Sequence, residues 1–114
     1  MKGYIKIMET LIKDLFRHTD DYAEKEVCIS GWVRTIRASK NFGFIELNDG
    51  SFFKNLQIVM EDEKLDNYAE ISKLNVGSAI CAKGTLVLTP EAKQPFELKA
   101  AEITVEGKST PDYP

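Results

Sequence analysis

The sequence predicts an all-β domain, built as a five-stranded barrel with one helix between the third and fourth strands. Alternating apolar residues mark five strand segments, and a helical pattern interrupts them after the third. The chain has 114 residues, of which 43% are hydrophobic and 29% are charged. That length and composition suit one domain with a single core. We expect this domain to span residues 25–107, after a lead-in segment over residues 1–24.

The lead-in segment carries one apolar cluster and no targeting signal. Its apolar spacing predicts a short helix or a packed segment over residues 9–16, and residues 20–24 predict a turn. The apolar residues of this cluster are Leu11, Ile12, Leu15 and Phe16. No apolar run approaches a membrane span, and no small-residue cleavage site follows the first lysines. We therefore expect a cytoplasmic protein with no membrane partner.

Two-residue alternation between residues 27 and 60 predicts the first three strands. Their inward positions are Val27, Ile29, Gly31 and Val33, then Ile45 and Leu47, then Leu56, Ile58 and Met60. Gly31 permits a bend in the first strand, and Asn48-Asp49-Gly50 predicts a hairpin turn after the second. Phe42 and Phe44 fall on the other face of the second strand, which leaves two aromatic rings outside the expected core.

A helix and two further strands complete the predicted order. The helix is predicted from four apolar residues at helical spacing before Gly77, namely Leu65, Tyr68, Ile71 and Leu74. The inward positions of the last two strands are Ile80, Ala82, Gly84 and Leu86, then Phe96, Leu98 and Ala100. Ile103 and Val105 have the opposite parity, which predicts a bulge near Ala101-Glu102. Three strands, a helix and two strands are the element order of an OB-fold, a five-stranded Greek-key barrel.

Charge is distributed unevenly along the chain. The formal net charge is −3, whereas general nucleic-acid coat proteins are normally basic. No acidic residue occurs between Val27 and Ile45, where Arg34, Arg37 and Lys40 all lie. A local basic site on an acidic body favours a specific RNA contact over bulk attraction to phosphates. The alternative is a solvated strand edge with three unrelated cations.

Phe44 and Gln57 are the first two candidate binding residues. Alternation places Phe44 beside Glu46 and away from Ile45 and Leu47. An aromatic ring on a polar barrel face offers a platform on which an unpaired base can stack. The outward amide of Gln57 can both donate to and accept from the edge of such a base. In the alternative interpretation, the N-terminal segment covers the rings of Phe42 and Phe44.

Glu97 and Arg37 are weaker candidates from the pattern alone. Glu97 is expected to face outward on the fifth strand, where a carboxylate can accept from base amino or imino groups. A salt bridge to Lys83 or Lys99 is the competing interpretation. Arg37 has the parity of the inward Val33, so it faces outward only if the first strand bends or ends before it.

The remaining reactive side chains indicate no enzyme site. Cys28 and Cys81 lie in predicted strands without the spacing of a metal site, and we expect buried free thiols. His18 is expected at the surface with no metal-binding partner. One histidine cannot support a Ser/His/Asp or Cys/His set, and the glycines form no phosphate-binding loop. We expect no catalytic residue and no metal in this chain.

Four sequence blocks resemble the N-terminal domain of class II aminoacyl-tRNA synthetases, and most closely the anticodon-binding domain of asparaginyl-tRNA synthetases. They are Gly31-Trp32-Val33-Arg34, Phe42-Gly43-Phe44-Ile45-Glu46-Leu47, Asn48-Asp49-Gly50-Ser51 and Leu56-Gln57-Ile58-Val59. The resemblance extends over residues 11–113 and keeps the order and spacing of the blocks. Aspartyl enzymes usually carry more arginines after the first block and an Arg-Asp-Arg turn, and this sequence has neither.

The resemblance implies roles for four residues in binding a tRNA anticodon. Phe44 would stack on the central anticodon base, a uridine, while Gln57 and Arg37 would hydrogen-bond the same base. Glu97 would help to recognise a neighbouring base, and residues 90–95 would lie near the outer anticodon bases. The role of Arg37 depends on the resemblance alone.

The resemblance also implies a class II catalytic domain, which is expected to follow residues 108–114, the start of a linker. ATP and Mg²⁺ would belong to that domain, so we expect this chain alone to hold no cofactor, to be inactive and to be monomeric. A domain of a longer ligase is the expected origin, and a stand-alone paralogue is the alternative. The competing functions are a generic single-strand binder, an aspartyl-type anticodon domain and a protein-interaction domain.

Overall fold

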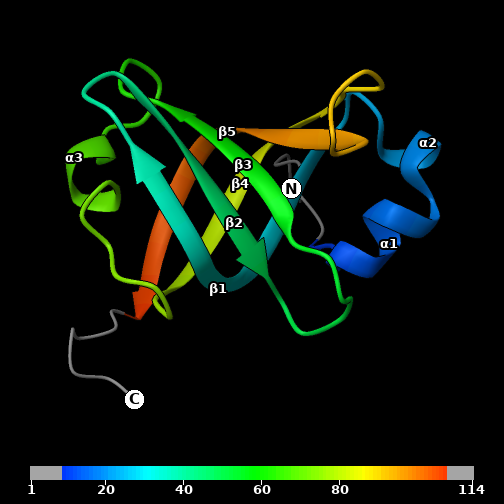
Figure 1. The fold of residues 1–114 in the computed structure, drawn as a ribbon, viewed down its shortest axis with the longest axis horizontal. Coiled ribbons are helices and arrows are strands. Elements are labelled where there is room, and N and C mark those ends of the chain that lie inside the picture. The colour runs from blue at the N-terminus through cyan, green and yellow to red at the C-terminus, as the bar shows by residue number, and fades with distance from the viewer. Residues whose placement is uncertain (1–8, 108–114) are drawn as a thin grey trace, which may run out of the picture.

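Five strands close into a barrel in the computed structural model, which describes residues 9–107 (Figure 1). The strands are β1 (Glu26–Ala38), β2 (Phe42–Asn48), β3 (Leu56–Glu61), β4 (Ala79–Leu88) and β5 (Phe96–Gly107). Their order around the barrel is β1-β2-β3-β5-β4, and only β3 and β5 pair in parallel. The predicted OB-fold order, with a helix between β3 and β4, is confirmed.

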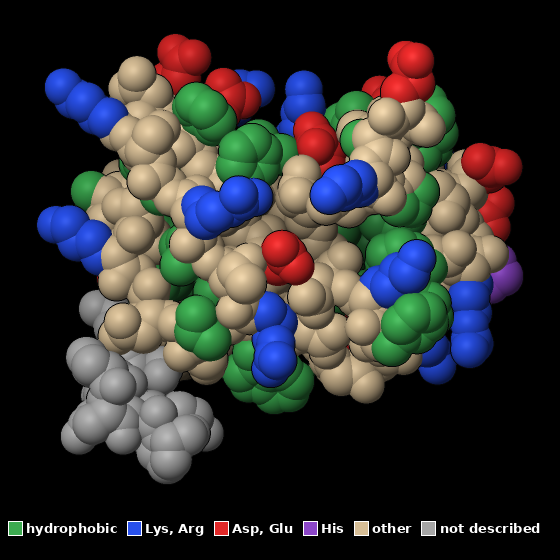
Figure 2. Space-filling model, in the orientation of Figure 1, with side chains coloured by type: hydrophobic (Ala, Val, Ile, Leu, Met, Phe, Trp, Pro, Cys, Tyr) green, Lys and Arg blue, Asp and Glu red, His purple; other side chains and the backbone are tan. Residues whose placement is uncertain are grey.

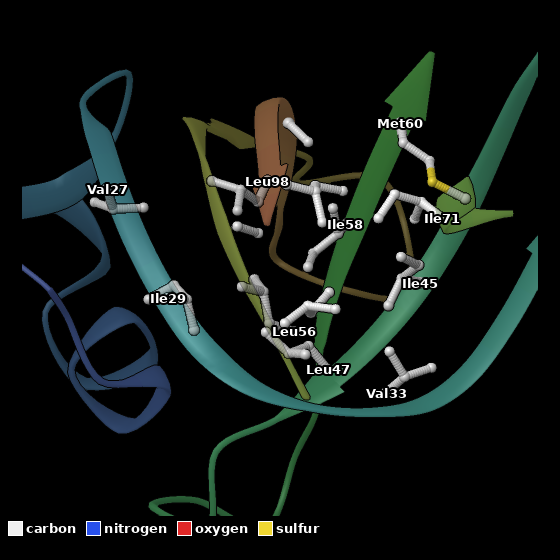
Figure 3. Packing of buried hydrophobic residues seen from close by; sticks show 14 of the residues in the cluster. Val27, Ile29, Val33, Ile45, Leu47, Leu56, Ile58, Met60, Ile71 and Leu98 are labelled. Atoms are coloured by element: carbon white, nitrogen blue, oxygen red, sulfur yellow. The ribbon is translucent and has the colours of Figure 1, made fainter. Parts of the chain in front are cut away.

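The barrel interior is filled by the apolar residues that alternate along each strand. Figure 3 shows side chains from β1, β2, β3 and β5 converging on this core, with Ile71 at one end. Fully buried members include Ile29, Val33, Ile45, Leu47, Leu56, Ile58, Ile80, Leu86 and Leu98. Burying one such side chain contributes about 1.5–3 kcal/mol to the free energy of folding. Burial of the core therefore provides most of the stabilisation of the closed barrel.

β1 is long enough to pair with two different strands along its length. A bulge in β1 reverses which of its residues point into the barrel beyond it. The first half of β1 pairs with β4 and its second half pairs with β2. The register with β2 shifts between Val33 and Thr35, which leaves Arg34 as the extra residue. Beyond the bulge, Ile36 lies opposite the buried Ile45, and Arg37 points outward. Strict alternation was therefore wrong for Arg37.

The second bulge of the barrel lies in β5. It confirms the bulge predicted near Ala101-Glu102 from the changed parity of Ile103 and Val105. Lys83 of β4 pairs with Glu102, but the next residue, Gly84, pairs with Ala100. Ala101 is thus the extra residue, and Ile103 returns to the core side, where it is 2% exposed. Backbones approach closely here, because a Cβ on Gly84 would lie 2.1 Å from the carbonyl oxygen of Lys99.

The helix between β3 and β4 is shorter than the sequence predicted. All four residues of the predicted helical face are buried, but α3 spans only Tyr68–Ile71. The Asn67 side chain donates to the carbonyl oxygen of Ile103 and does not cap the helix. The Tyr68 hydroxyl donates to the carbonyl oxygen of Ser39 at 2.7 Å, and burial raises the pKa of Tyr68. This bond ties α3 to the β1–β2 loop.

The lead-in segment forms two short helices at the opposite end of the barrel from α3, α1 (Ile12–Arg17) and α2 (Thr19–Tyr22) (Figure 1). The expected turn over residues 20–24 is therefore partly helical. The β2–β3 loop caps α1, because Asp49 and Ser51 accept from the backbone N–H groups of Ile12 and Lys13. The predicted hairpin turn is part of a longer, seven-residue loop, residues 49–55.

The expectations for membrane spans, for His18 and for the two ends of the chain have the following outcomes. None of the helices in residues 9–107 has the length and apolar character needed to cross a membrane. His18 is exposed, as expected. Residues 1–8 and 108–114, which include the expected extension and linker, lie outside the described part of the chain.

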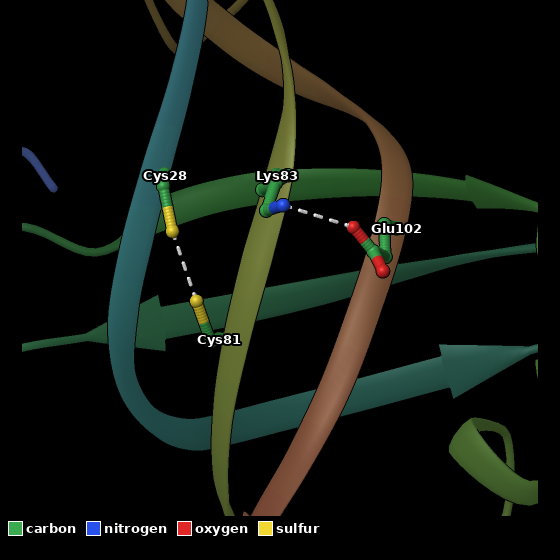
Figure 4. A network of polar contacts seen from close by, with 4 residues as sticks. All are labelled: Cys28, Cys81, Lys83 and Glu102. Atoms are coloured by element: carbon green, nitrogen blue, oxygen red, sulfur yellow. Dashed lines mark hydrogen bonds and ion pairs between the residues drawn. The ribbon is translucent and has the colours of Figure 1, made fainter. Parts of the chain in front are cut away.

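The two cysteines are free thiols, as expected, but they lie side by side on the outer surface of β1 and β4 (Figure 4). Their sulfur atoms are 2.9 Å apart. Burial, together with the contact to Cys81, raises the pKa of Cys28 to about 12. The 53-residue separation of the two cysteines gave no sign of this contact, which depends on the register of β1 against β4.

Candidate nucleic-acid interface

The outer face of β1, β2, β3 and β5 carries two rows of side chains that run across the strands. In the first row, Arg37 pairs with Phe44, Phe44 with Val59, and Val59 with Lys99. The row therefore places an aromatic and an aliphatic side chain between two cations. The bulge in β1 brings Arg37 into this row, directly across from Phe44. Lys99 was not among the predicted binding residues, although its parity matches that of Glu97.

The aromatic pair Phe42 and Phe44 separates two grooves on this face. Their ring centroids are 5.7 Å apart with the rings nearly perpendicular, at 88°. Phe42 is 49% exposed and Phe44 is half-buried. The smaller groove has a volume of about 330 Å³ and is lined by Arg37, Ala38, Ser39, Phe42, Gly43 and Phe44. Phe44 and Arg37 thus line the same groove.

The larger groove lies on the other side of Phe44 and has a volume of about 830 Å³. Both Glu97 and Lys99 of β5 line it, together with Val59. Three acidic residues at the end of β3 and just after it also line the groove, namely Glu61, Asp62 and Glu63. The groove therefore combines an aromatic wall with one cation and several carboxylates, so that a bound base would meet hydrogen-bond acceptors.

The second row consists of polar side chains and begins with Glu46, which pairs with Gln57. Gln57 faces outward as predicted, but it is diagonal to Phe44 rather than opposite it, because Phe44 pairs with Val59. Its Nε2 donates to Glu97 Oε1 at 3.4 Å, and its Oε1 accepts from Gln94 Nε2 at 3.0 Å. One orientation of the amide satisfies both contacts.

The hydrogen bond from Gln94 to Gln57 was not predicted from the sequence. Gln94 lies in the β4–β5 loop, residues 89–95, where Thr89 holds the turn by donating to the carbonyl oxygen of Gln94. Two further amides stiffen the row at the Glu46 side, because Asn55 donates to Glu46 and Asn48 donates to Asn55. Side chains that are already hydrogen-bonded lose less entropy when a ligand binds.

Neither of two competing interpretations finds support within residues 9–107. Lys83 pairs with Glu102 at 3.2 Å, so it is not the partner of Glu97, and no ion pair within residues 9–107 joins Glu97 to Lys99. The described part of the N-terminal segment also leaves Phe42 and Phe44 uncovered. Phe16 of this segment instead stacks on Phe52, at a centroid distance of 4.9 Å, and packs against Phe96 with the rings tilted by 53° at 4.8 Å.

The surface around the two rows has mixed charge. Figure 2 shows basic, acidic and hydrophobic side chains interspersed on the face that carries β2 and β3. Arg34, Arg37 and Lys40 are all exposed. On this face the basic side chains are separated by acidic and hydrophobic ones and form no continuous basic surface (Figure 2). Binding that depends on a few placed contacts fits this surface better than general attraction to phosphate backbones.

A five-stranded OB barrel with an aromatic ring on its outer β2 surface defines a class of nucleic-acid-binding domain. Residues 27–106 match the family model described as an OB-fold nucleic acid binding domain, and the chain belongs to that family. The asparagine–tRNA ligase of Acetivibrio thermocellus is 69% identical to it over 105 residues, which are 92% of this chain and 23% of the ligase. The resemblance drawn from residues 31–59 is therefore confirmed.

Solved structures of asparaginyl-tRNA synthetases also match this chain. The asparaginyl-tRNA synthetase of Pyrococcus horikoshii matches with a TM-score of 0.77 at 17% identity, over 92% of this chain and 24% of that one, and shows a shared fold. The asparaginyl-tRNA synthetase of Entamoeba histolytica matches with a TM-score of 0.67 at 27% identity, over 78% of this chain and 22% of that one. The chain spans about a quarter of the length of these relatives.

Proposed function

We propose that this chain is the anticodon-binding domain of an asparagine–tRNA ligase and that its binding partner is the anticodon loop of asparagine tRNA. The observation that carries the proposal is the position of Phe44, whose ring borders two grooves and has Arg37 directly across from it. Similarity to asparagine–tRNA ligases, at 69% identity in the example above, supports the choice of tRNA.

In this proposal, the central anticodon uridine stacks on Phe44 and its edge meets polar side chains. Stacking of one base on an aromatic side chain contributes about 1–3 kcal/mol. The guanidinium of Arg37 donates to a carbonyl oxygen of the uracil, which has two such oxygens. Gln57 offers both a donor and an acceptor to the same edge. Its present bond to Glu97 is long, at 3.4 Å, and is therefore readily exchanged for a bond to a base.

Glu97 is assigned to a neighbouring base. Its carboxylate lines the larger groove, on the side of Phe44 away from Arg37. An amino or imino group of a base placed there would donate to this acceptor. Lys99 lies in the same groove, where its ammonium group can neutralise the phosphate that links the two nucleotides.

The reaction of the whole ligase belongs to the remainder of such a protein. We propose that a class II catalytic domain, covalently linked to this one, uses ATP and Mg²⁺ to join L-asparagine to its tRNA in the cytoplasm. The present chain supplies tRNA selection and acts as a monomer. Four of its residues make the proposed anticodon contacts, namely Arg37, Phe44, Gln57 and Glu97.

Binding of two anticodon stem-loops tests the proposal. One has the asparagine-tRNA sequence, and the other differs only by cytidine in place of the central uridine. We expect the altered stem-loop to bind about 5- to 150-fold more weakly, because polar groups left unpaired in a binding site cost about 1–3 kcal/mol. Fluorescence anisotropy at fixed salt measures both affinities. Equal affinities would indicate a generic single-strand binder and would contradict the proposal.

A further inference from the structure

Three side chains with metal-binding atoms converge on the outer surface of β1 and β4, on the half of β1 that does not take part in the proposed RNA interface. They are Glu9, Cys28 and Cys81, and their ligand atoms all lie within 4.8 Å of one another. Figure 4 shows the two thiols pointing toward each other across the strands, next to the ion pair of Lys83 and Glu102. None of these groups has a role in the proposed anticodon site.

The sheet register explains why the two thiols meet. Cys28 pairs with Lys83, and Cys81 pairs with Ser30, so the cysteines are diagonal neighbours on one face. Their sulfur atoms are 2.9 Å apart, and both cysteines are free. Diagonal neighbours have Cβ atoms farther apart than directly opposite residues. An unstrained disulfide requires Cβ atoms about 3.5–4.5 Å apart, whereas an ion between the sulfurs tolerates a wider spacing.

Glu9 completes the cluster from a third segment of the chain. It forms a parallel bridge with Cys28, secured by a 2.8 Å hydrogen bond from the backbone N–H of Thr10 to the carbonyl oxygen of Cys28. The Ser30 hydroxyl donates to Glu9 Oε2 at 2.5 Å. A hydroxyl that orients a carboxylate in this way is a typical outer partner of a metal ligand. The carboxylate is thus held by the backbone and by a neighbouring side chain.

We propose that Cys28, Cys81 and Glu9 form a binding site for a thiophilic divalent cation of the zinc type. Two thiolates and a carboxylate are a ligand set that Zn²⁺ accepts, with a fourth position left to water. Zn–S bonds of about 2.3 Å in tetrahedral geometry require the sulfurs to separate to roughly 3.8 Å. Rotation of the two cysteine side chains supplies that change without moving the paired strands.

The charges around the cluster are consistent with a bound divalent cation. Binding displaces the two thiol protons to solvent, so the three ligands together carry a charge of −3. A divalent cation reduces this charge to −1, and the adjacent ion pair of Lys83 and Glu102 adds no net charge to it. Lys83 lies directly across from Cys28 in the paired strands, and its ion pair with Glu102, at 3.2 Å, holds it in place.

Cobalt(II) binding to the reduced 114-residue chain tests the proposal without RNA. We expect one Co²⁺ per chain, with sulfur-to-cobalt charge-transfer absorption and the visible bands of a tetrahedral site, and displacement of the cobalt by Zn²⁺. Cys28→Ser and Cys81→Ser should each abolish the charge-transfer band, and Glu9→Gln should weaken binding about tenfold. Glu26→Gln removes a carboxylate of β1 outside the cluster and should leave binding unchanged.

Thiol labelling of the unaltered protein gives a second readout if a serine variant fails to fold. Zn²⁺ should slow the reaction of both cysteines with an aromatic disulfide reagent by at least about tenfold. The proposal is wrong if no charge-transfer band forms, if the band survives in either serine variant, or if Zn²⁺ gives no protection. Because neither measurement involves RNA, those outcomes leave the anticodon proposal untouched.

Discussion

Phe44→Ala is expected to weaken binding of the asparagine-tRNA anticodon stem-loop by about 1–3 kcal/mol, the range found when one stacking platform is lost. The ring borders both grooves of the proposed interface, so its removal takes away the surface on which the central base stacks. The loss should be nearly independent of salt, because the substitution removes no charge. Fluorescence anisotropy with the stem-loop at two salt concentrations measures the effect.

Phe53→Ala is the matched control for this substitution. Phe53 is 80% exposed and lies in the β2–β3 loop, and it lines neither of the two grooves. Its removal should leave the affinity for the stem-loop unchanged. If Phe53→Ala weakens binding as much as Phe44→Ala, the RNA binds through exposed aromatic side chains in general and the assigned interface is wrong.

Gly84→Ala should lower the free energy of unfolding by about 3 kcal/mol, because overpacking a core commonly costs 1–3 kcal/mol or more. The added methyl group would lie 2.1 Å from the carbonyl oxygen of Lys99 and 2.9 Å from the Cα of Ala100. These are backbone atoms of the bulged part of β5, so β4 and β5 must separate to admit it. Urea unfolding followed by the fluorescence of Trp32 measures the change.

Gly107→Ala provides the matched control at the other end of the same strand pair. A Cβ on Gly107 would meet only the Cβ of Ala79, at an ordinary distance of 3.8 Å. We expect this variant to differ from the parent by less than about 1 kcal/mol. Equal unfolding free energies for the Gly84 and Gly107 variants would show that the close approach at the β5 bulge does not constrain the barrel.

The two bulges illustrate how much of the fold the sequence could predict. The β5 bulge was predicted because Ile103 and Val105 change parity after Ala100. The β1 bulge carried the same kind of signal, since Val33 and Ile36 are both apolar and lie three residues apart. The expectation of strict alternation obscured it, so the pattern alone put Arg37 on the outer face only on condition that the first strand bends or ends before it.

Contacts between distant segments were beyond what the sequence could predict. Gln94 reaches Gln57 from a loop 37 residues away, and Cys28 meets Cys81 only because β1 and β4 pair in one particular register. Periodicity assigns a residue to a face, but it does not specify which residue of another strand lies beside it. The outward direction of Phe44, Gln57 and Glu97 was therefore predictable, whereas their hydrogen-bond partners were not.

Discrimination of the central base by Gln57 tests the proposed interface most directly. Four affinities are needed, those of the parent chain and of Gln57→Ala for the asparagine-tRNA stem-loop and for the stem-loop with cytidine at the central position. We predict that Gln57→Ala reduces the preference for uridine by at least about 1 kcal/mol, the size of coupling seen between groups in contact. An unchanged preference for uridine in the variant would contradict the assignment of this base to the face formed by β2 and β3.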